Sequence, residues 1–267
     1  MRRIRLLTNR HRAPSTNHVL GLLLAFNAGA VNAGGFLVLH MYTSHMTGFA
    51  SQVADGLVLG NRTLVLNALG AILAFATGAA VCAVLVNWSR AHRLHGVYAL
   101  PLLLEAALMF PFGLAGAVTL SWPTPFAVPI TVLLLSFIMG LQNAVASKTS
   151  GGSVRTTHMT GNITDFGMEV GKWFYWTRHG AAPSHLQAER HWKRLRTSGG
   201  LLGMFVLGGL SGALGFKYVG FICVVPLAAL LLALSVPPLL RDLPRSQALL
   251  RRLGLAGKSP TPRGPAL

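Results

Sequence analysis

The residues that first suggest chemistry are two copies of one tetrapeptide. The sequence HMTG occurs as His45-Met46-Thr47-Gly48 and again, in the second half of the chain, as His158-Met159-Thr160-Gly161. An imidazole, a hydroxyl and a flexible glycine are suited to binding a polar group, or an anion at a helix N-terminus. A single chance match of this kind is expected on the order of a few tenths of a time, so the flanking residues must decide whether it matters.

Composition places both motifs in a membrane protein. The chain has 267 residues, of which 52% are hydrophobic and only 11% are charged, whereas a soluble domain carries roughly 25% charged residues. A bilayer span needs about 20 apolar residues, and uncharged runs of this length predict six spans. We place these spans at 19–41, 63–88, 97–120, 124–146, 199–216 and 218–240.

The positions of Lys and Arg predict how the spans are oriented. Five lie in the N-terminal tail, two in the second loop, eight from Lys148 to Arg196 and six in the C-terminal tail, and six spans place these segments on one side. Only Arg62 and Lys217 fall on the other side. Because basic residues stay in the cytoplasm, both termini are expected there. The net charge of +17 is thus explained by topology and the lipid bilayer, and we expect no nucleic acid partner.

The two halves of the chain share more than the tetrapeptide. FNAGAVNA at 26–33 matches FIMGLQNA at 137–144 in Phe, Gly, Asn and Ala. Further along, FATGAAVCA at 75–83 matches FVLGGLSGA at 205–213, and LPLLLEAAL at 100–108 resembles VPLAALLLA at 225–233. These blocks predict repeat one at about 19–120 and repeat two at about 124–240. With three spans each, the repeats enter the membrane from opposite sides, as in many secondary transporters.

The expected fold class is therefore an all-α integral membrane protein with six transmembrane helices in two inverted three-helix repeats. Each HMTG motif would begin a half-helix or re-entrant segment of about three turns, with Thr47 or Thr160 as its N-cap. The helix N-termini would present N–H groups to a ligand inside the protein. The alternative is that HMTG is a structural corner, in which the glycines only allow a turn and close packing.

The candidate substrate-binding residues combine the two motifs with neighbouring amides. They are Asn32, His45, Thr47, Gly48, Asn143, His158, Thr160, Gly161 and Asn162. Glu105 is an acid well inside a predicted span, which makes it a candidate for proton or cation coupling. Leu230 matches it in the second half, and pairing with His92, Arg93 or His95 near the interface is the alternative.

Asp165 is a second candidate coupling group, and Glu169 follows it one helical turn later. The alternative is that both are solvated loop acids. The histidines show no spacing typical of a metal site, and no nucleotide-binding or nucleophile motif occurs. We therefore expect no metal, no cofactor, no catalytic residues and no enzymatic activity.

Three segments are expected to lie outside the membrane. Residues 1–18 form a basic cytoplasmic tail. Residues of about 184–196 form a basic helix, begun by a capping box of Ser184 and Gln187, which would lie on the cytoplasmic membrane surface near anionic headgroups. Residues 241–267 form a second basic cytoplasmic tail, which contains Pro and Gly and is expected to be disordered.

The doubled Met-Thr-Gly motif, each copy after a helix containing Gly and Asn, resembles the YoaK-like family of bacterial inner-membrane proteins, a family defined by a domain of unknown function. The resemblance covers about 19–240. Members commonly read MTGN, which the second copy matches through Asn162, whereas Phe49 stands at that place in the first copy. The resemblance implies a six-span protein of the bacterial inner membrane and supplies no substrate.

Together these features favour a small secondary transporter or permease for a polar or anionic small molecule, and they leave a homo-oligomer open. The alternative is a non-transporting membrane scaffold or assembly factor, whose basic cytoplasmic helix would dock partners. An intramembrane enzyme with His45 or His158 as base is disfavoured, because no nucleophile or metal site accompanies either residue.

Overall fold

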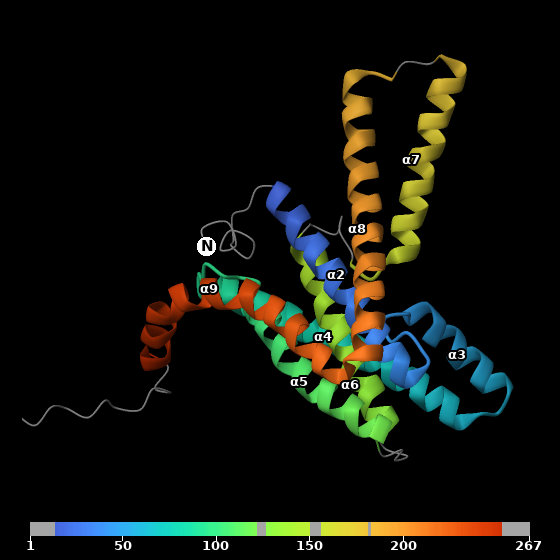
Figure 1. The fold of residues 1–267 in the computed structure, drawn as a ribbon. Helices are drawn as coiled ribbons and strands as arrows, with labels where there is room; N and C mark the ends of the chain where they lie inside the picture. The colour runs from blue at the N-terminus through green and yellow to red at the C-terminus, as the bar shows by residue number, and fades with distance from the viewer. Residues whose placement is uncertain (1–13, 122–126, 150–155, 181–182, 253–267) are drawn as a thin grey trace, which may run out of the picture.

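The computed structural model describes residues 14–121, 127–149, 156–180 and 183–252. The described residues form eight α-helices and one short 3-10 helix (Figure 1). In chain order these are α2 (Pro14–Leu39), α3 (Met46–Val58), α4 (Arg62–Ala91), α5 (Ala99–Ser121), α6 (Ala127–Thr149), α7 (Met159–His179), α8 (His185–Tyr218), η1 (Gly220–Cys223) and α9 (Val224–Arg252). The basic tail before Pro14 and the disorder expected beyond Arg252 fall outside the described residues.

Six stretches of these helices are long and apolar enough to cross a membrane. They are His18–Leu37, Arg62–Ala91, Ala99–Val118, Ile130–Thr149, His185–Tyr218 and Gly220–Asp242. They correspond in order to the six runs expected from the sequence. The prediction of an all-α, multi-pass membrane protein is confirmed.

Several expected boundaries differ from the observed ones. Helix α2 begins at Pro14, within the segment 1–18 that was expected to be a tail. The basic segment 184–196 is the first part of α8, which continues without a break to Tyr218, so it is not a separate surface helix. The capping box of Ser184 and Gln187 is present and begins this long helix. At the other end, α9 extends through Arg252, so the prediction of a disordered tail from residue 241 is wrong for residues 241–252.

Helices α2 and α8 approach each other backbone to backbone. A side chain at Gly208 would overlap the carbonyl group of Phe26, and one at Gly29 would overlap that of Phe205. Gly212 lies against Ala30 in the same way, so the two helices run in the same direction. Small residues allow this close approach, which favours helix association where lipid removes the hydrophobic driving force.

Helices α4 and α6 meet through the same arrangement. A side chain at Gly78 would overlap the carbonyl oxygen of Phe137, and one at Gly140 would overlap that of Phe75. The four glycines and four phenylalanines of the two contacts are those that the sequence repeat aligns. The first spanning helix of each half therefore packs against the second spanning helix of the other half.

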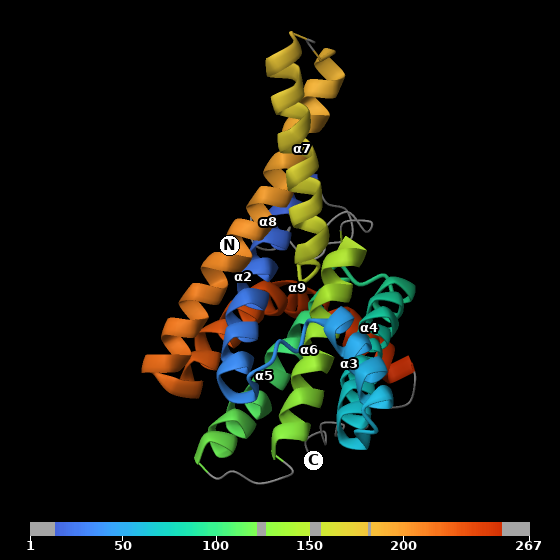
Figure 2. The ribbon, with the colours of Figure 1, turned by 90° about the vertical axis from the view of Figure 1, so that its right-hand side faces the viewer.

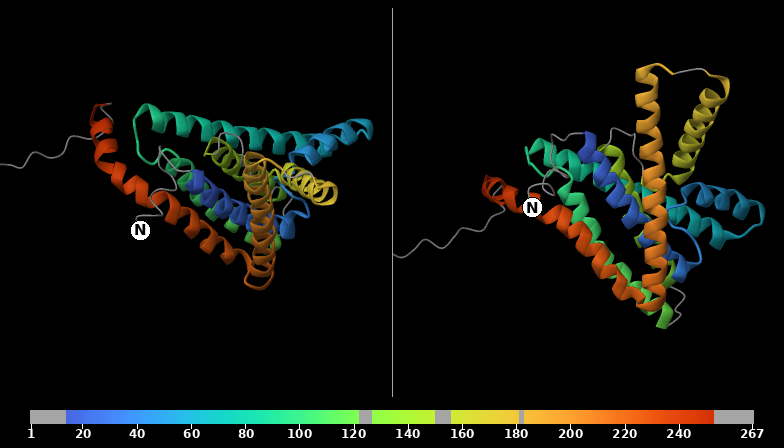
Figure 3. Two further views of the ribbon diagram at one scale, coloured as in Figure 1. Left: turned by 90° about the horizontal axis from the view of Figure 1, so that it is seen from above. Right: turned by 45° about the horizontal axis from the view of Figure 1, so that its top comes forward.

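The third spanning helices, α5 and α9, complete the bundle as an antiparallel pair. Gly113 of α5 lies against Val224 of α9, and Gly116 lies against Phe221 in the adjoining η1. At the other end Gly96, just before α5, lies against Pro238 of α9. Seen from above, α4 and α9 lie along opposite sides of the bundle with α2 between them (Figure 3, left). The most buried spans are those of α2 and α6.

The chain also forms two helical hairpins beside the bundle. One consists of α3 and the start of α4, which meet at Gly60 in a left-handed conformation. The other consists of α7 and the start of α8, and it rises beyond the rest of the molecule (Figure 1). In Figure 2, α7 ascends from its motif whereas α3 descends from its own. Both HMTG motifs therefore stand where a hairpin leaves the bundle.

Alanine at Gly208 tests the close contact of α2 with α8. An added methyl group would force the backbones apart, so the variant Gly208→Ala should lower the free energy of unfolding by about 1–3 kcal/mol. The matched control is Gly203→Ala on the same helix, because nothing lies near that position. Alanine there should leave stability unchanged or raise it by up to about 1 kcal/mol. Thermal unfolding in detergent measures both, and equal effects would contradict the packing described.

Candidate functional site

The two HMTG motifs have the same local conformation. His45 and His158 occupy the N-cap positions of α3 and α7, with φ, ψ of −90°, 70° and −85°, 60°. The first helical hydrogen bonds run from Phe49 N to the carbonyl oxygen of His45 and from Asn162 N to that of His158, each at 3.2 Å. The prediction that the motif threonines cap these helices is therefore wrong, since each helix has already begun at the preceding methionine.

Steric crowding explains why each motif contains a glycine at its fourth position. A Cβ atom at Gly48 would overlap the imidazole ring of His45, and one at Gly161 would overlap that of His158. Each histidine ring thus lies over the glycine of its own motif, and neither makes a side-chain capping hydrogen bond. The two motifs therefore share the arrangement of their side chains as well as their sequence.

Both motif segments line one cavity of about 580 Å³ between α2 and α8. The first segment contributes Tyr42, Ser44 and His45, and the second contributes Thr157, Met159 and Thr160. The remaining described walls are mainly apolar and come from the two helices, at Gly29, Asn32, Ala33, Phe36, Leu37, Phe205, Val206, Gly209, Leu210 and Ala213. The close contact at Gly29 therefore also forms part of the cavity wall.

The segment between α2 and α3 is held against this cavity. Ser44 Oγ donates a hydrogen bond to Asn32 Oδ1 at 3.1 Å, which ties the first motif to α2. The chain leaves α2 at His40, whose φ of +50° lies in the left-handed region, and Tyr42 then stacks on Phe36 with ring centroids 4.7 Å apart. A left-handed residue other than glycine is uncommon and marks a sharp, fixed turn.

The sequence-based site list is brought together only in part. Of its members, Asn32, His45 and Thr160 line the cavity. The others do not line it: Thr47, Gly48, Asn143, His158, Gly161 and Asn162. Asn143 instead lies on α6 one turn beyond Gly140, with its Oδ1 buried and without a hydrogen-bond partner in the described part of the chain. Asn162 is buried, and its amide donates to the sulfur of Met159 at 3.9 Å.

Sequence reasoning missed the hydroxyl residues that precede each motif. Thr43 and Thr156 are both fully buried, and neither Oγ1 atom has a hydrogen-bond partner within the described residues. Ser44 and Thr157, which follow them, both line the cavity. The repeated unit is therefore a hexapeptide, Thr-Ser/Thr-His-Met-Thr-Gly, and aligning two residues further upstream would have revealed it.

Helix α7 differs from the half-helix expected after the second motif. It has 21 residues, whereas α3 has 13, so the estimate of about three turns fits only the first copy. Asp165 is exposed on α7 and lies away from the cavity. Glu169, one turn later, is only 3% exposed and packs against α8.

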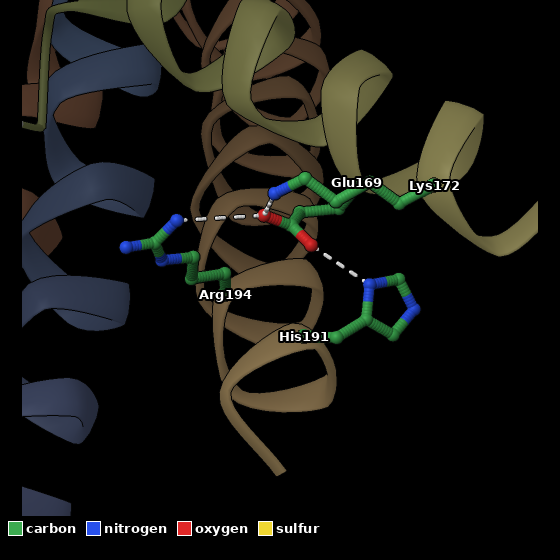
Figure 4. A network of polar contacts seen from close by, with 4 residues as sticks. All are labelled: Glu169, Lys172, His191 and Arg194. Atoms are coloured by element: carbon green, nitrogen blue, oxygen red, sulfur yellow. Dashed lines mark hydrogen bonds and ion pairs between the residues drawn. The ribbon is translucent and has the colours of Figure 1, made fainter. Parts of the chain in front are cut away.

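Glu169 is the centre of the polar contact between α7 and α8 (Figure 4). Its Oε2 accepts from His191 Nδ1 at 2.8 Å, and its Oε1 lies 2.8 Å from Lys172 Nζ and 3.7 Å from an Arg194 nitrogen. Burial alone would raise the pKa of the Glu169 carboxyl, but hydrogen bonds and charge from Lys172 and His191 hold that pKa below its usual value. The carboxylate thus stays ionised and fixes the hairpin.

Glu105 does not pair with the basic residues near the end of its helix. It is fully buried, and its Oε1 accepts a hydrogen bond from Asn27 Nδ2 on α2 at 3.3 Å. The expected alternative partner His95 binds Asp242 instead, with Nδ1 and Oδ1 2.8 Å apart. The interpretation of Glu105 as an interfacial ion pair is therefore wrong.

Six candidate spans, and an open cavity of small-molecule size lined by residues from both copies of a duplicated motif, define a multi-pass membrane protein with a candidate binding cavity. The family model described as "Protein of unknown function (DUF1275)" matches residues 20–236. The chain belongs to this family, as the Met-Thr-Gly motifs indicated.

One curated relative is similar over part of the chain. It is the "UPF0700 transmembrane protein YoaK" of Bacillus subtilis (strain 168), which is 30% identical over 155 residues. The match covers 57% of this chain and 66% of the relative, so just under two thirds of that protein is spanned. No solved structure matches the chain.

Removing the Glu169 charge should loosen the α7–α8 hairpin. In Glu169→Gln the buried His191 loses its ionised partner, and the local free energy of opening should fall by up to about 3 kcal/mol. Hydrogen exchange of residues 159–179 at neutral pH measures this. The control is Glu189→Gln, whose side chain is 64% exposed and lies 3.6 Å from His185. Equal exchange in both variants would show that the network does not fix the hairpin.

The same network predicts an acid-sensitive hairpin. Because the pKa of Glu169 is lowered in the folded state, its contribution to stability is complete above the ordinary Glu pKa of about 4.3. The contribution disappears as pH falls through the lowered value. Exchange of residues 159–179, corrected for its intrinsic pH dependence, should therefore accelerate in acid in the native protein. No such acceleration is expected in Glu169→Gln, which has no carboxylate to protonate.

Proposed function

We propose that this protein is a small secondary transporter or permease whose substrate binds in the cavity between α2 and α8. The observation that carries the proposal is that both HMTG segments, distant in sequence, line this one cavity. Irregular backbone at membrane depth is tolerated where it is buried in protein or lines a cavity. A pair of structural corners would have no reason to meet around the same space.

The proposed architecture is two inverted repeats with re-entrant segments at the motifs. Its support is the reciprocal packing of α2 on α8 and of α4 on α6, through aligned glycines and phenylalanines. On this proposal, Asn143 and Thr47 occupy the positions relative to α4 that Asn32 and Thr160 occupy relative to α8. In the conformation open to the other side of the membrane, Asn143 and Thr47 would line an equivalent cavity beside α4. This gives a role to two candidate residues that do not line the cavity beside α8.

The lining suggests the class of substrate. A volume of about 580 Å³ lies within the range of small-molecule pockets, about 300–1,000 Å³. Amide, hydroxyl and imidazole groups face largely apolar walls, and no Lys, Arg, Asp or Glu is among the described lining residues. The N-terminus of α7 adds a partial positive charge. These features favour a small polar or anionic molecule with an apolar part, and a binding role without catalysis.

The proposed setting is the bacterial inner membrane with both termini in the cytoplasm. Support comes from the distribution of Lys and Arg along the sequence. In the structure, Arg90 on α4 donates to Tyr98 Oη at 3.0 Å, and that hydroxyl donates to the carbonyl oxygen of Lys148 on α6 at 3.0 Å. The two basic helix ends thus lie at one end of the bundle.

A second candidate function is a membrane scaffold, and one observation favours it. The α7–α8 hairpin exposes Trp173, Phe174, Tyr175 and Trp192 among its basic residues. Such a surface would suit a protein partner or the membrane interface. Because 184–196 is continuous with a span, this role is best tested by substituting the exposed aromatic residues rather than by deleting the segment.

Cysteine accessibility separates these functions without a known substrate. Ser44→Cys and Thr160→Cys would each be made in a Cys82→Ala, Cys223→Ala background and treated with a membrane-impermeant methanethiosulfonate reagent. A transporter exposes its cavity to each side in turn, so each cysteine should react both from outside intact cells and in inverted vesicles. Reaction from one side alone would contradict transport and favour the scaffold.

The control for this experiment is Val58→Cys at the end of α3. Val58 is 87% exposed and lies outside the cavity, so it should react from a single side whatever the function. Labelling of this control from both sides would indicate leaky vesicles.

A further inference from the structure

Three polar side chains from three helices meet in the interior of the bundle. They are Asn27 on α2, Glu105 on α5 and Gln142 on α6, and each is fully buried. Asn27 donates to one carboxyl oxygen of Glu105 at 3.3 Å, and the amide of Gln142 faces the same carboxyl group. None of the three lines the cavity beside α8, so this cluster is separate from the proposed substrate site.

The hydrogen bonding of the cluster is incomplete in a specific way. Within the described residues, Asn27 Oδ1, Glu105 Oε2 and both amide atoms of Gln142 have no hydrogen-bond partner. Buried polar groups are nearly always paired, and here the unpaired oxygens outnumber the unpaired donor nitrogen. A proton on Glu105 Oε2 would turn an unpaired acceptor into a donor, which an amide oxygen beside it can accept.

The helices packed against α5 offer no cation to balance a charged carboxylate. From α4, the thiol of Cys82 lies within electrostatic reach of Glu105. On α6, Lys148 lies at the helix end, beyond Gln142, and its charge acts on the same thiol. Arg90, at the end of α4, donates to a tyrosine hydroxyl. No salt bridge to Glu105 is formed by any described residue.

The three remaining neighbours, α2, α9 and η1, lead to the same conclusion, and η1 (Gly220–Cys223) contains no charged residue. Helix α2 contributes the neutral amide of Asn27, and on α9 the carboxyl of Asp242 is engaged by His95 and by the backbone N–H of Gly96. Burying an unpaired charge is costly. The surroundings of Glu105 therefore favour the neutral acid.

The cluster departs from the sequence repeat at every position. The alignment of the two halves places Ile138 opposite Asn27, Val31 opposite Gln142 and Leu230 opposite Glu105. Apolar side chains thus suffice at all three counterparts, and Val31 and Ile138 are fully buried there. Packing alone does not explain why three polar side chains meet here while their counterparts are all apolar. A fully apolar core would avoid the unpaired polar groups.

We propose that Glu105, Asn27 and Gln142 form a proton-binding site inside the membrane domain. Glu105 carries the proton as a neutral acid, and the amides serve both forms, accepting from the acid and donating to the carboxylate. One proton from water is bound and the same proton is released, with no other reactant. Its use to drive substrate movement rests on the proposed transport function, whereas proton binding itself does not.

The number of oxygens favours a proton over a metal cation. A hard cation such as Mg²⁺ requires about six oxygen ligands, and larger cations take more. The cluster offers three unpaired oxygens among the described residues, at Glu105, Asn27 and Gln142. A proton needs only one donor and one acceptor.

Infrared spectroscopy with isotope labelling tests the site directly. Besides Glu105, the glutamates of the chain are Glu169 and Glu189. Glu169 is held ionised by its partners, and Glu189→Gln, at an exposed position, is the control that should leave the carboxylic acid region of the spectrum unchanged. Protein made with side-chain ¹³C-labelled glutamate should therefore show, at about pH 7, one isotope-shifted carboxylic acid C=O band, which Glu105→Gln removes.

The absence of that band in the native protein would overturn the proposal, and this readout does not depend on how well any variant folds. Replacement of the band by carboxylate bands when KCl is exchanged for NaCl at equal ionic strength would also overturn it, because the site would then bind sodium. Persistence of the band in both salts is the expected result. In Asn27→Leu the band should change in frequency, since one hydrogen-bond partner is lost.

The two proposals fail in different ways. A carboxylic acid band together with one-sided labelling of the cavity cysteines would leave the proton site in place and remove transport. Two-sided labelling without the band would keep transport and remove the proton site. If both succeed, a pH gradient across proteoliposomes should shift the labelling of Thr160→Cys at least severalfold towards one side, and Glu105→Gln should abolish that shift.

Discussion

Close contact between helix backbones at glycines is the interaction on which this molecule depends. In lipid there is little hydrophobic driving force between helices, so van der Waals packing must hold them together. The contacts at Gly29 and Gly208, and at Gly78 and Gly140, bring carbonyl groups against bare Cα atoms. They join the two halves of the chain to each other, and one of them also provides a wall of the cavity. The site is therefore inseparable from the packing that stabilises the bundle.

Much of this arrangement follows from sequence. Apolar length predicted the spans because a bilayer demands it. The repeat singled out the glycines and phenylalanines that form the close contacts, although it did not predict which of them touch. The position of the N-cap within the motif did not follow from the sequence. The choice between His45 and Thr47 depends on where the preceding chain turns, and His40 sets that turn with a left-handed backbone. The length of α8 was also underestimated, since a basic segment and an apolar one can share a single helix.

The least predictable feature was the partner of Glu105. Comparison of the two halves emphasises positions that agree, whereas Asn27 and Gln142 occur where the halves disagree. Neither residue neighbours Glu105 in the chain, and only the crossing of α2, α5 and α6 brings the three together. Comparison of the two halves therefore reveals the residues that they share and passes over a polar cluster that only one half-to-half arrangement contains.

The continuity of α8 has a mechanical consequence. His191, which holds the hairpin through Glu169, and Phe205, which lines the cavity, lie on one unbroken helix, about 21 Å apart along its axis. A helix of this length is stiff, so a tilt of the α7–α8 hairpin displaces one side of the cavity. Whatever binds preferentially to one tilt of the hairpin must change affinity in the cavity, and a molecule in the cavity must act on the hairpin by the same free energy.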